Sequence, residues 1–153
     1  MRKVVFICIA IISFNCKSHD IIEANKLTIS QVKVLNQNKD IVIATFGQPL
    51  QITTEYSEMD DNKMYIYYYK GLKFYIINNL VESFEISSSM FLFTNYHIKV
   101  GDNISTLKNL FSNSFALRSL DYLKLDIKDS DMFLTIEFNS ISNNISKINI
   151  GNY

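Results

Sequence analysis

The chain has 153 residues, with 15 basic and 15 acidic side chains and a hydrophobic content of 48%. This length and composition suffice for one domain built around one core. The charges form neither a basic stripe nor an acidic tail. Phosphate binding needs clustered Lys and Arg, so nucleic acid is excluded as an expected partner.

The chain begins in the way that secretory signal peptides begin. Arg2 and Lys3 precede an unbroken apolar run over residues 4–12, which is far shorter than the ~20 residues of a membrane-spanning helix. Cys16 follows where the run stops. This arrangement resembles a bacterial lipoprotein signal of the looser type found in Bacteroidota, although residues 13–15 depart from the usual pattern. The resemblance implies a signal peptide over residues 1–15 and lipidation of Cys16. An ordinary cleaved signal and an uncleaved anchor are the alternatives.

The sequence contains two cysteines, Cys8 and Cys16. Cys8 lies inside the predicted signal, so the mature chain has no disulfide and its stability must come from packing. Residues 16–38 are polar with scattered Ile, Leu and Val. We interpret them as a lipid-anchored tether and lead-in segment, with a short strand possible over residues 26–35.

A short helix packed on the sheet is predicted over residues 39–46, with a strand as the alternative. Gly47 follows its last turn and Pro49, the one proline of the chain, comes two residues later, which together form a helix stop. The next apolar segment leads into a loop with four acids between residues 55 and 61. A calcium loop needs a glycine at its sharp turn, and this loop has none, so we interpret it as a solvated hairpin tip rather than a metal site.

The stretch from Met64 to Ile86 holds much of the aromatic mass of the chain. Two residue pairs that favour tight turns, Lys70-Gly71 and Asn78-Asn79, divide the stretch into three short apolar segments. An antiparallel meander of three strands is therefore predicted. A two-residue turn at Lys70-Gly71 places Tyr69 opposite Leu72. At the second turn we predict a three-residue, bulged loop through Leu80, because that register puts Phe84 and Ile86 on the face of Phe74.

The other face of this meander is the candidate binding surface. Exposed aromatic patches mark partner sites, and tyrosine suits interfaces because it combines a large area with a polar tip. The alternative is that these rings only cap the core. The predicted partner-binding residues are Tyr68, Tyr75, Ile66, Ile77, Lys73 and Glu82.

A second unit follows from residue 98 to residue 150. Gly101 breaks a strand, Asp102 or Asn103 caps a helix that runs to Phe111, and strands are predicted over residues 120–127, 132–138 and 145–150. Apolar residues of the first unit recur 64 positions later in the second. The predicted fold class is therefore α+β: a single domain over residues 39–153 with an antiparallel sheet built from two tandem helix-plus-meander repeats, 39–88 and 98–150, and both helices packed on one face.

Two patterns carry a resemblance to known families. Phe46-Gly47-x-Pro49 before an aromatic strand, and Ile98-x-Val100-Gly101-Asp102 before a helix, resemble the SmpA/OmlA (BamE-like) lipoproteins. The tandem arrangement is similar to the β-lactamase inhibitor protein group. The tryptophan frequent in the first family is missing, and no cysteine pair matches the disulfides of the second. The first resemblance implies a lipoprotein that binds another envelope protein.

Catalysis is not expected. His19 and His97 have no partner at metal-ligand or triad spacing, and no cofactor or metal site is indicated. We therefore predict a non-enzymatic cell-envelope lipoprotein, anchored to the outer or inner membrane, that binds an envelope or secreted protein through its aromatic sheet face. The alternative is a periplasmic inhibitor or immunity protein that blocks an enzyme or toxin. A lipocalin-like ligand cavity is a third possibility.

Overall fold

A computed structural model of the chain describes residues 18–58 and 61–152. The predicted signal peptide and Cys16 lie outside these residues. In chain order the elements are β1 (Ile21–Ile22), the 3₁₀ turn η1 (Ala24–Lys26), β2 (Thr28–Ile29), β3 (Val32–Lys33), α1 (Lys39–Phe46), β4 (Gln51–Ser57), β5 (Asn62–Tyr69), β6 (Leu72–Ile77), β7 (Leu80–Ile86), the 3₁₀ turn η2 (Ile104–Leu107), α2 (Ser112–Leu117), β8 (Tyr122–Ile127), β9 (Met132–Phe138) and β10 (Ile145–Asn152).

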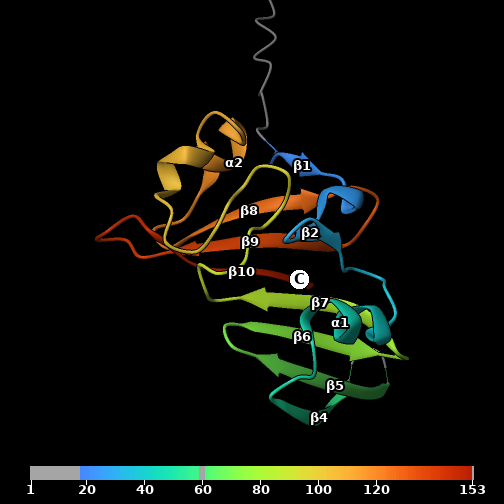
Figure 1. Ribbon diagram of the computed structural model, residues 1–153. Helices are drawn as coiled ribbons and strands as arrows, with labels where there is room; N and C mark the ends of the chain where they lie inside the picture. Colours follow the sequence, from blue (N-terminus) through green and yellow to red (C-terminus); the bar gives the residue numbers. More distant parts are fainter. Residues whose placement is uncertain (1–17, 59–60, 153) are drawn as a thin grey trace, which may run out of the picture.

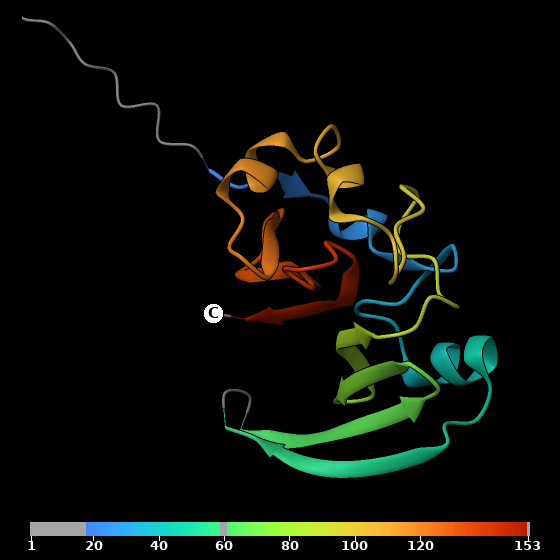
Figure 2. The ribbon, with the colours of Figure 1, turned by 90° about the vertical axis from the view of Figure 1, so that its left-hand side faces the viewer.

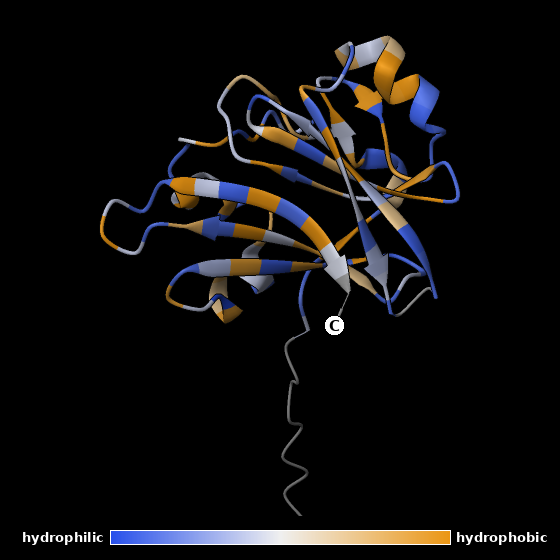
Figure 3. Ribbon diagram, turned by 90° about the horizontal axis from the view of Figure 1, so that it is seen from below, coloured by the Kyte–Doolittle hydropathy of each residue, from blue (hydrophilic) through white to orange (hydrophobic). Residues whose placement is uncertain are grey.

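One large sheet organises the molecule (Figure 1). Its strand order is β1-β8-β9-β10-β7-β6-β5-β4, and it is mixed because β1 pairs with β8 in parallel while the other pairs are antiparallel. Apolar and polar residues alternate along many of its strands, as Figure 3 shows, so one face is apolar and the other mixes polar, charged and aromatic side chains. The helices, β2 and β3 cover the apolar face, and the other face is open in Figure 2.

The predicted fold class of two helix-plus-meander repeats is wrong. Strands make up 45% of the structure, in a mixed eight-stranded sheet with two short helices. The second predicted helix is replaced by the turn η2, and α2 begins only at Ser112. The reason is local: residues 102–114 are rich in Asn, Ser and Thr, which favour caps and turns over helix interiors. The Asn103 side chain caps η2 by accepting a hydrogen bond from the Ser105 amide.

The first predicted helix is confirmed. It spans Lys39–Phe46, the Asn38 side chain accepts a hydrogen bond from the Asp40 amide, and Gly47 ends it with a φ of +82°. Val42 is buried, and the Phe46 ring packs 5.3 Å from the Phe74 ring between centroids. The helix therefore covers the apolar face of β6.

The meander is confirmed in its faces but not in its second loop. Tyr69 pairs with Leu72, and Phe74 pairs with Phe84, as the sequence predicts. The loop after β6 is a two-residue turn, because Ile77 pairs directly with Leu80, and Asn78 and Asn79 both have positive φ. A bulge inside β7 restores the register instead. The prediction put the additional residue in the loop, whereas the structure has it as a bulge in β7. The sequence does not separate the two cases, because both place Phe84 and Ile86 on the same face as Phe74.

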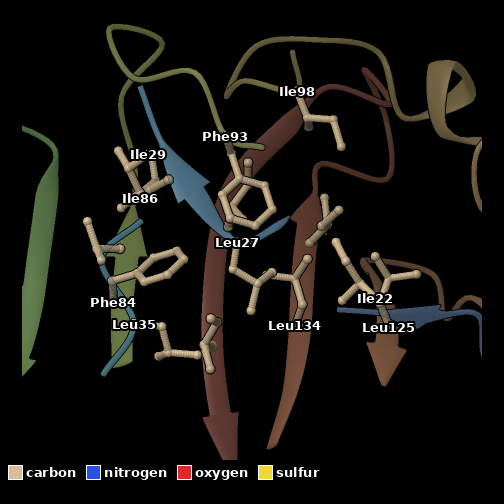
Figure 4. Close-up of a cluster of buried hydrophobic side chains, with 14 of the residues drawn as sticks. Ile22, Leu27, Ile29, Leu35, Phe84, Ile86, Phe93, Ile98, Leu125 and Leu134 are labelled. Atoms are coloured by element: carbon tan, nitrogen blue, oxygen red, sulfur yellow. The ribbon is translucent and has the colours of Figure 1, made fainter. Parts of the chain in front are cut away.

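The segment predicted as a tether contributes to the core. Ile22, Leu27, Ile29, Val34 and Leu35 are each at most 3% exposed, and Figure 4 shows several of them among the buried side chains of the sheet. Asp20 also binds α2, since its carboxylate accepts a hydrogen bond from the Ser114 amide at 2.9 Å and its amide donates to Ser114 Oγ at 2.8 Å. Residues 20–35 therefore belong to the folded domain.

Replacing Gly71 with alanine is expected to lower the free energy of unfolding by about 2–4 kcal/mol. Gly71 has a φ of +77°, and a Cβ built there lies 2.2 Å from the Ser88 Cβ, so both strain and overlap oppose the change. Gly101→Ala is the control, because that glycine also has a positive φ but has no atom within 4 Å of the added Cβ. Urea unfolding of both variants separates the two effects, and an equal loss would show that Ser88 is not the obstacle.

Candidate functional site: the open sheet face

The open face contains a row of side chains that crosses seven strands. Cross-strand pairs link one residue of each strand to the next, so these side chains lie on one line. At about 4.8 Å per strand the line is roughly 29 Å long. We call it the cross-sheet row: Gln51, Tyr68, Lys73, Glu85, Asn149, Thr135 and Lys124.

Lys73 and Glu85 form the centre of the row. Lys73 Nζ lies 2.9 Å from Glu85 Oε1 and 5.8 Å from the centroid of the Tyr68 ring. The hydrogen bond with Glu85 raises the pKa of Lys73, and burial, followed by the charge of Glu85, raises the pKa of Tyr75. Both side chains therefore remain protonated at neutral pH, and the face presents a fixed pattern of charge and aromatic rings.

A second charged group flanks the row on β9 and β10. Glu137 Oε1 accepts a hydrogen bond from the Asn149 side chain at 3.0 Å and lies 2.7 Å from Lys147 Nζ. On β8, Lys124 Nζ lies 4.1 Å from the centroid of the Phe133 ring. Beside them is a surface hollow of about 600 Å³, lined among others by Tyr122, Thr135, Glu137, Asn139, Ser140 and Ser146.

The structure places the predicted binding residues unequally. Tyr68, Lys73 and Tyr75 are partly exposed on the open face. Ile66 and Ile77 point to the same side but are only 3% and 5% exposed, so they are covered there and offer a partner almost no surface.

Glu82 falls in the bulge of β7. It lies between Ser83, which pairs with Tyr75, and Val81, which pairs with Ile76. It is partly exposed. Because of the bulge, the pairing of β6 with β7 passes over Glu82, unlike the other predicted binding residues of these two strands.

Sequence reasoning did not find the half of the site that comes from the second unit. The sequence did hold one signal for this half: polar residues alternate with apolar ones along the predicted strands and so point to the face opposite the core. These polar residues are Lys124, Glu137, Lys147 and Asn149. What the sequence does not show is that β10 pairs with β7, Ile148 opposite Ile86 and Asn149 opposite Glu85. That pairing joins the two halves into one face.

Among residues 18–58 and 61–152, no group of three or more His, Cys, Asp or Glu side chains is placed to hold a metal ion. His19 Nδ1 lies 3.6 Å from Asp126 Oδ1, and His97 is an exposed turn residue with a φ of +57°. Within the same residues, no helix has the length and apolarity that crossing a membrane requires.

No protein-family model matches this chain, and no curated protein matches it. The solved structures with a similar fold include the following two. One is an extracellular protein containing an SCP domain from Bacillus anthracis str. Ames, with a TM-score of 0.58, 7% identity and coverage of 80% of this chain and 45% of that one. The other is a cysteine-rich secretory protein from Staphylococcus aureus subsp. aureus Mu50, with a TM-score of 0.53, 11% identity and coverage of 87% and 50%.

These comparisons correct the proposed family. The chain is similar in fold to proteins described by an SCP domain or as cysteine-rich secretory proteins, and no match supports the SmpA/OmlA (BamE-like) family or the β-lactamase inhibitor protein group. The pattern Phe46-Gly47-x-Pro49 that suggested that family is explained by the end of α1. The chain spans about half the length of both matched structures. Both matched proteins are described as extracellular or secretory.

Proposed function

We propose that this protein is a non-enzymatic binding protein of the cell envelope or extracellular space, which recognises another protein through its open sheet face. The observation that carries the proposal is the cross-sheet row. At its centre two opposite charges lie side by side next to the Tyr68 ring, and the Lys73–Glu85 ion pair holds both charged groups in place. Ordered charged and aromatic groups on an uncovered face suit a protein partner, because complementary charges fix the docking register.

Photo-crosslinking tests the proposal at a position that tolerates a ring. A benzoylphenylalanine at Tyr75 points from the open face, and the matched control at Tyr65, which is 42% exposed, pairs with Ile76 and points from the opposite face. We expect one envelope or secreted protein to be crosslinked from position 75 and not from position 65. Crosslinking of the same protein from both positions would contradict recognition by the open face.

Charge reversal then tests the row itself. The double variant K73E/E85K keeps an ion pair between β6 and β7 but reverses its polarity, so the fold is maintained while the pattern presented to a partner changes. Capture from position 75 is expected to fall at least about tenfold, which corresponds to 1.4 kcal/mol of binding free energy. The identity of the captured protein separates the alternatives: an assembly component supports an envelope role, and an enzyme or toxin supports an inhibitor or immunity role.

The finer prediction on location is lipid attachment through Cys16. Several acyl chains at one amino terminus give stable membrane attachment, since each buried CH₂ contributes ~0.8 kcal/mol. Mass spectrometry of the mature amino terminus tests this prediction independently of the binding experiments. An acylated Cys16 as the first residue would support it, and an intact Met1 would contradict it.

A further inference from the structure

Strand β4 is an edge of the sheet that nothing described protects. It spans Gln51–Ser57 at the end of the strand order, with β5 on one side and no strand on the other (Figure 1). Natural proteins usually protect long edges with Lys, Pro or bulges. β4 has no Lys and no Pro, whereas the opposite edge, β1, is only two residues long.

The backbone groups that β4 presents outward follow from the neighbouring hairpin. A two-residue turn joins Tyr69 to Leu72, so these two residues exchange their hydrogen bonds within β5 and β6. Directions alternate along a strand, so the backbone of Ile66 faces β4, where its partner is Thr53. The outward-facing amides and carbonyls of β4 are therefore those of Ile52, Thr54 and Tyr56.

This edge is complementary to itself. Two copies of β4 paired antiparallel about Thr54 place Thr54 opposite Thr54 of the second copy and Ile52 opposite its Tyr56. Such pairs of β-branched and aromatic residues stabilise sheets. On the other face, Thr53 lies opposite Glu55 and Gln51 opposite Ser57, so the one charged residue of the strand meets no like charge. The outward backbone groups fall in register in the same arrangement.

Two large apolar side chains at this edge are also exposed to solvent. Ile52 is 50% exposed and Tyr56 is 60% exposed. Both share the side of the sheet on which Tyr67 and Tyr65 point, because Ile52 pairs with Tyr67. Pairing of two edges brings Ile52 of each copy against Tyr56 of the other. It thus covers apolar area that the single chain leaves in water.

We propose that two copies of this chain associate through β4, forming one continuous sheet across a twofold axis at Thr54. The interface is isologous, so it closes at two copies and removes the free edge. The cross-sheet row of each copy begins at Gln51 in β4. The two open faces therefore adjoin on the same side of the joined sheet, and the dimer is bivalent for any partner that the open face binds.

Sedimentation velocity of the full chain tests the proposal. It compares the wild type with two variants that carry opposite charges at position 54. The wild-type chain is expected to sediment at twice its mass of 17.7 kDa. Thr54→Lys and Thr54→Glu each place like charges opposite one another across the axis, and each is expected to weaken association at least tenfold. A 1:1 mixture of the two variants is expected to restore the dimer, because Lys then meets Glu. Thr45→Lys, at an exposed position of α1, is the control and is expected to leave the dimer unchanged.

Three results would overturn the proposal. The first is a wild-type chain that stays monomeric at about 100 μM, a concentration at which even a weak specific pair forms. The second is a dimer that persists in Thr54→Lys, which would mean that another surface carries the contact. The third is a mixture that fails to restore the dimer although each variant is folded by circular dichroism, which would exclude the Thr54-centred register.

Discussion

Replacing Leu27 with alanine is expected to lower the free energy of unfolding by about 2–5 kcal/mol, the usual cost of truncating a buried leucine. Leu27 is fully buried, and it lies in the core cluster together with residues of β6, β7 and β9. The removed methyl groups leave a cavity between the sheet and the segment that covers it. A loss of this size is a large part of the 5–15 kcal/mol by which typical domains are stable.

Lys26→Ala is the matched control for Leu27→Ala. Lys26 is the neighbouring residue, it is exposed, and it ends the turn η1. Its truncation is expected to change stability by no more than about 0.5 kcal/mol. Urea denaturation measures both variants. If residues 16–38 were a spacer, the two substitutions would have equally small effects, so the difference between them measures how far this segment belongs to the fold.

The sequence did not reveal this role because the segment has no periodic pattern. Its strands β1, β2 and β3 have two residues each, which is too short for alternation to be recognised. Their partners are also distant in sequence: Ile22 pairs with Ile127, and Ile29 forms a bridge with Phe93. Scattered apolar residues in a polar stretch are typical both of a linker and of a segment that inserts single side chains into a core.

Local signals, by contrast, predicted local structure well. The stop at Gly47 and Pro49 defined the end of α1, and the Lys70-Gly71 turn defined the register of β5 and β6. The apolar stripe over residues 104–111 was misleading. The stripe consisted of Ile104, Leu107, Leu110 and Phe111. Ile104 and Leu107 are buried, but in the 3₁₀ turn η2, and Phe111 is buried just before α2, whereas Leu110 is 44% exposed. The apolar pattern thus identified three of four core residues correctly but not the backbone conformation that holds them.

Replacing Phe84 with alanine is expected to cost about 3–5 kcal/mol of unfolding free energy, because a large aromatic side chain leaves a fully buried position. Phe84 lies on β7, opposite Phe74, and its ring centroid lies 5.8 Å from that of Phe93 in the loop region that follows β7. Phe115→Ala is the control. Phe115 is only partly buried and stacks against Arg118, with the Arg118 guanidinium carbon 4.0 Å from its ring centroid, so its loss is expected to be less than half as large.

The shape of the unfolding curve carries as much information as its midpoint. Phe84 is on β7, the strand that joins the first half of the sheet to β10 of the second half through Ile86 and Ile148. Residues of both halves and of the amino-terminal segment form one buried cluster, so unfolding is expected to be a single transition for the wild-type chain and for Phe84→Ala. Two transitions would show that β4–β7 and β8–β10 fold as separate units. In that case the continuity of the cross-sheet row would depend on the β7–β10 pairing alone.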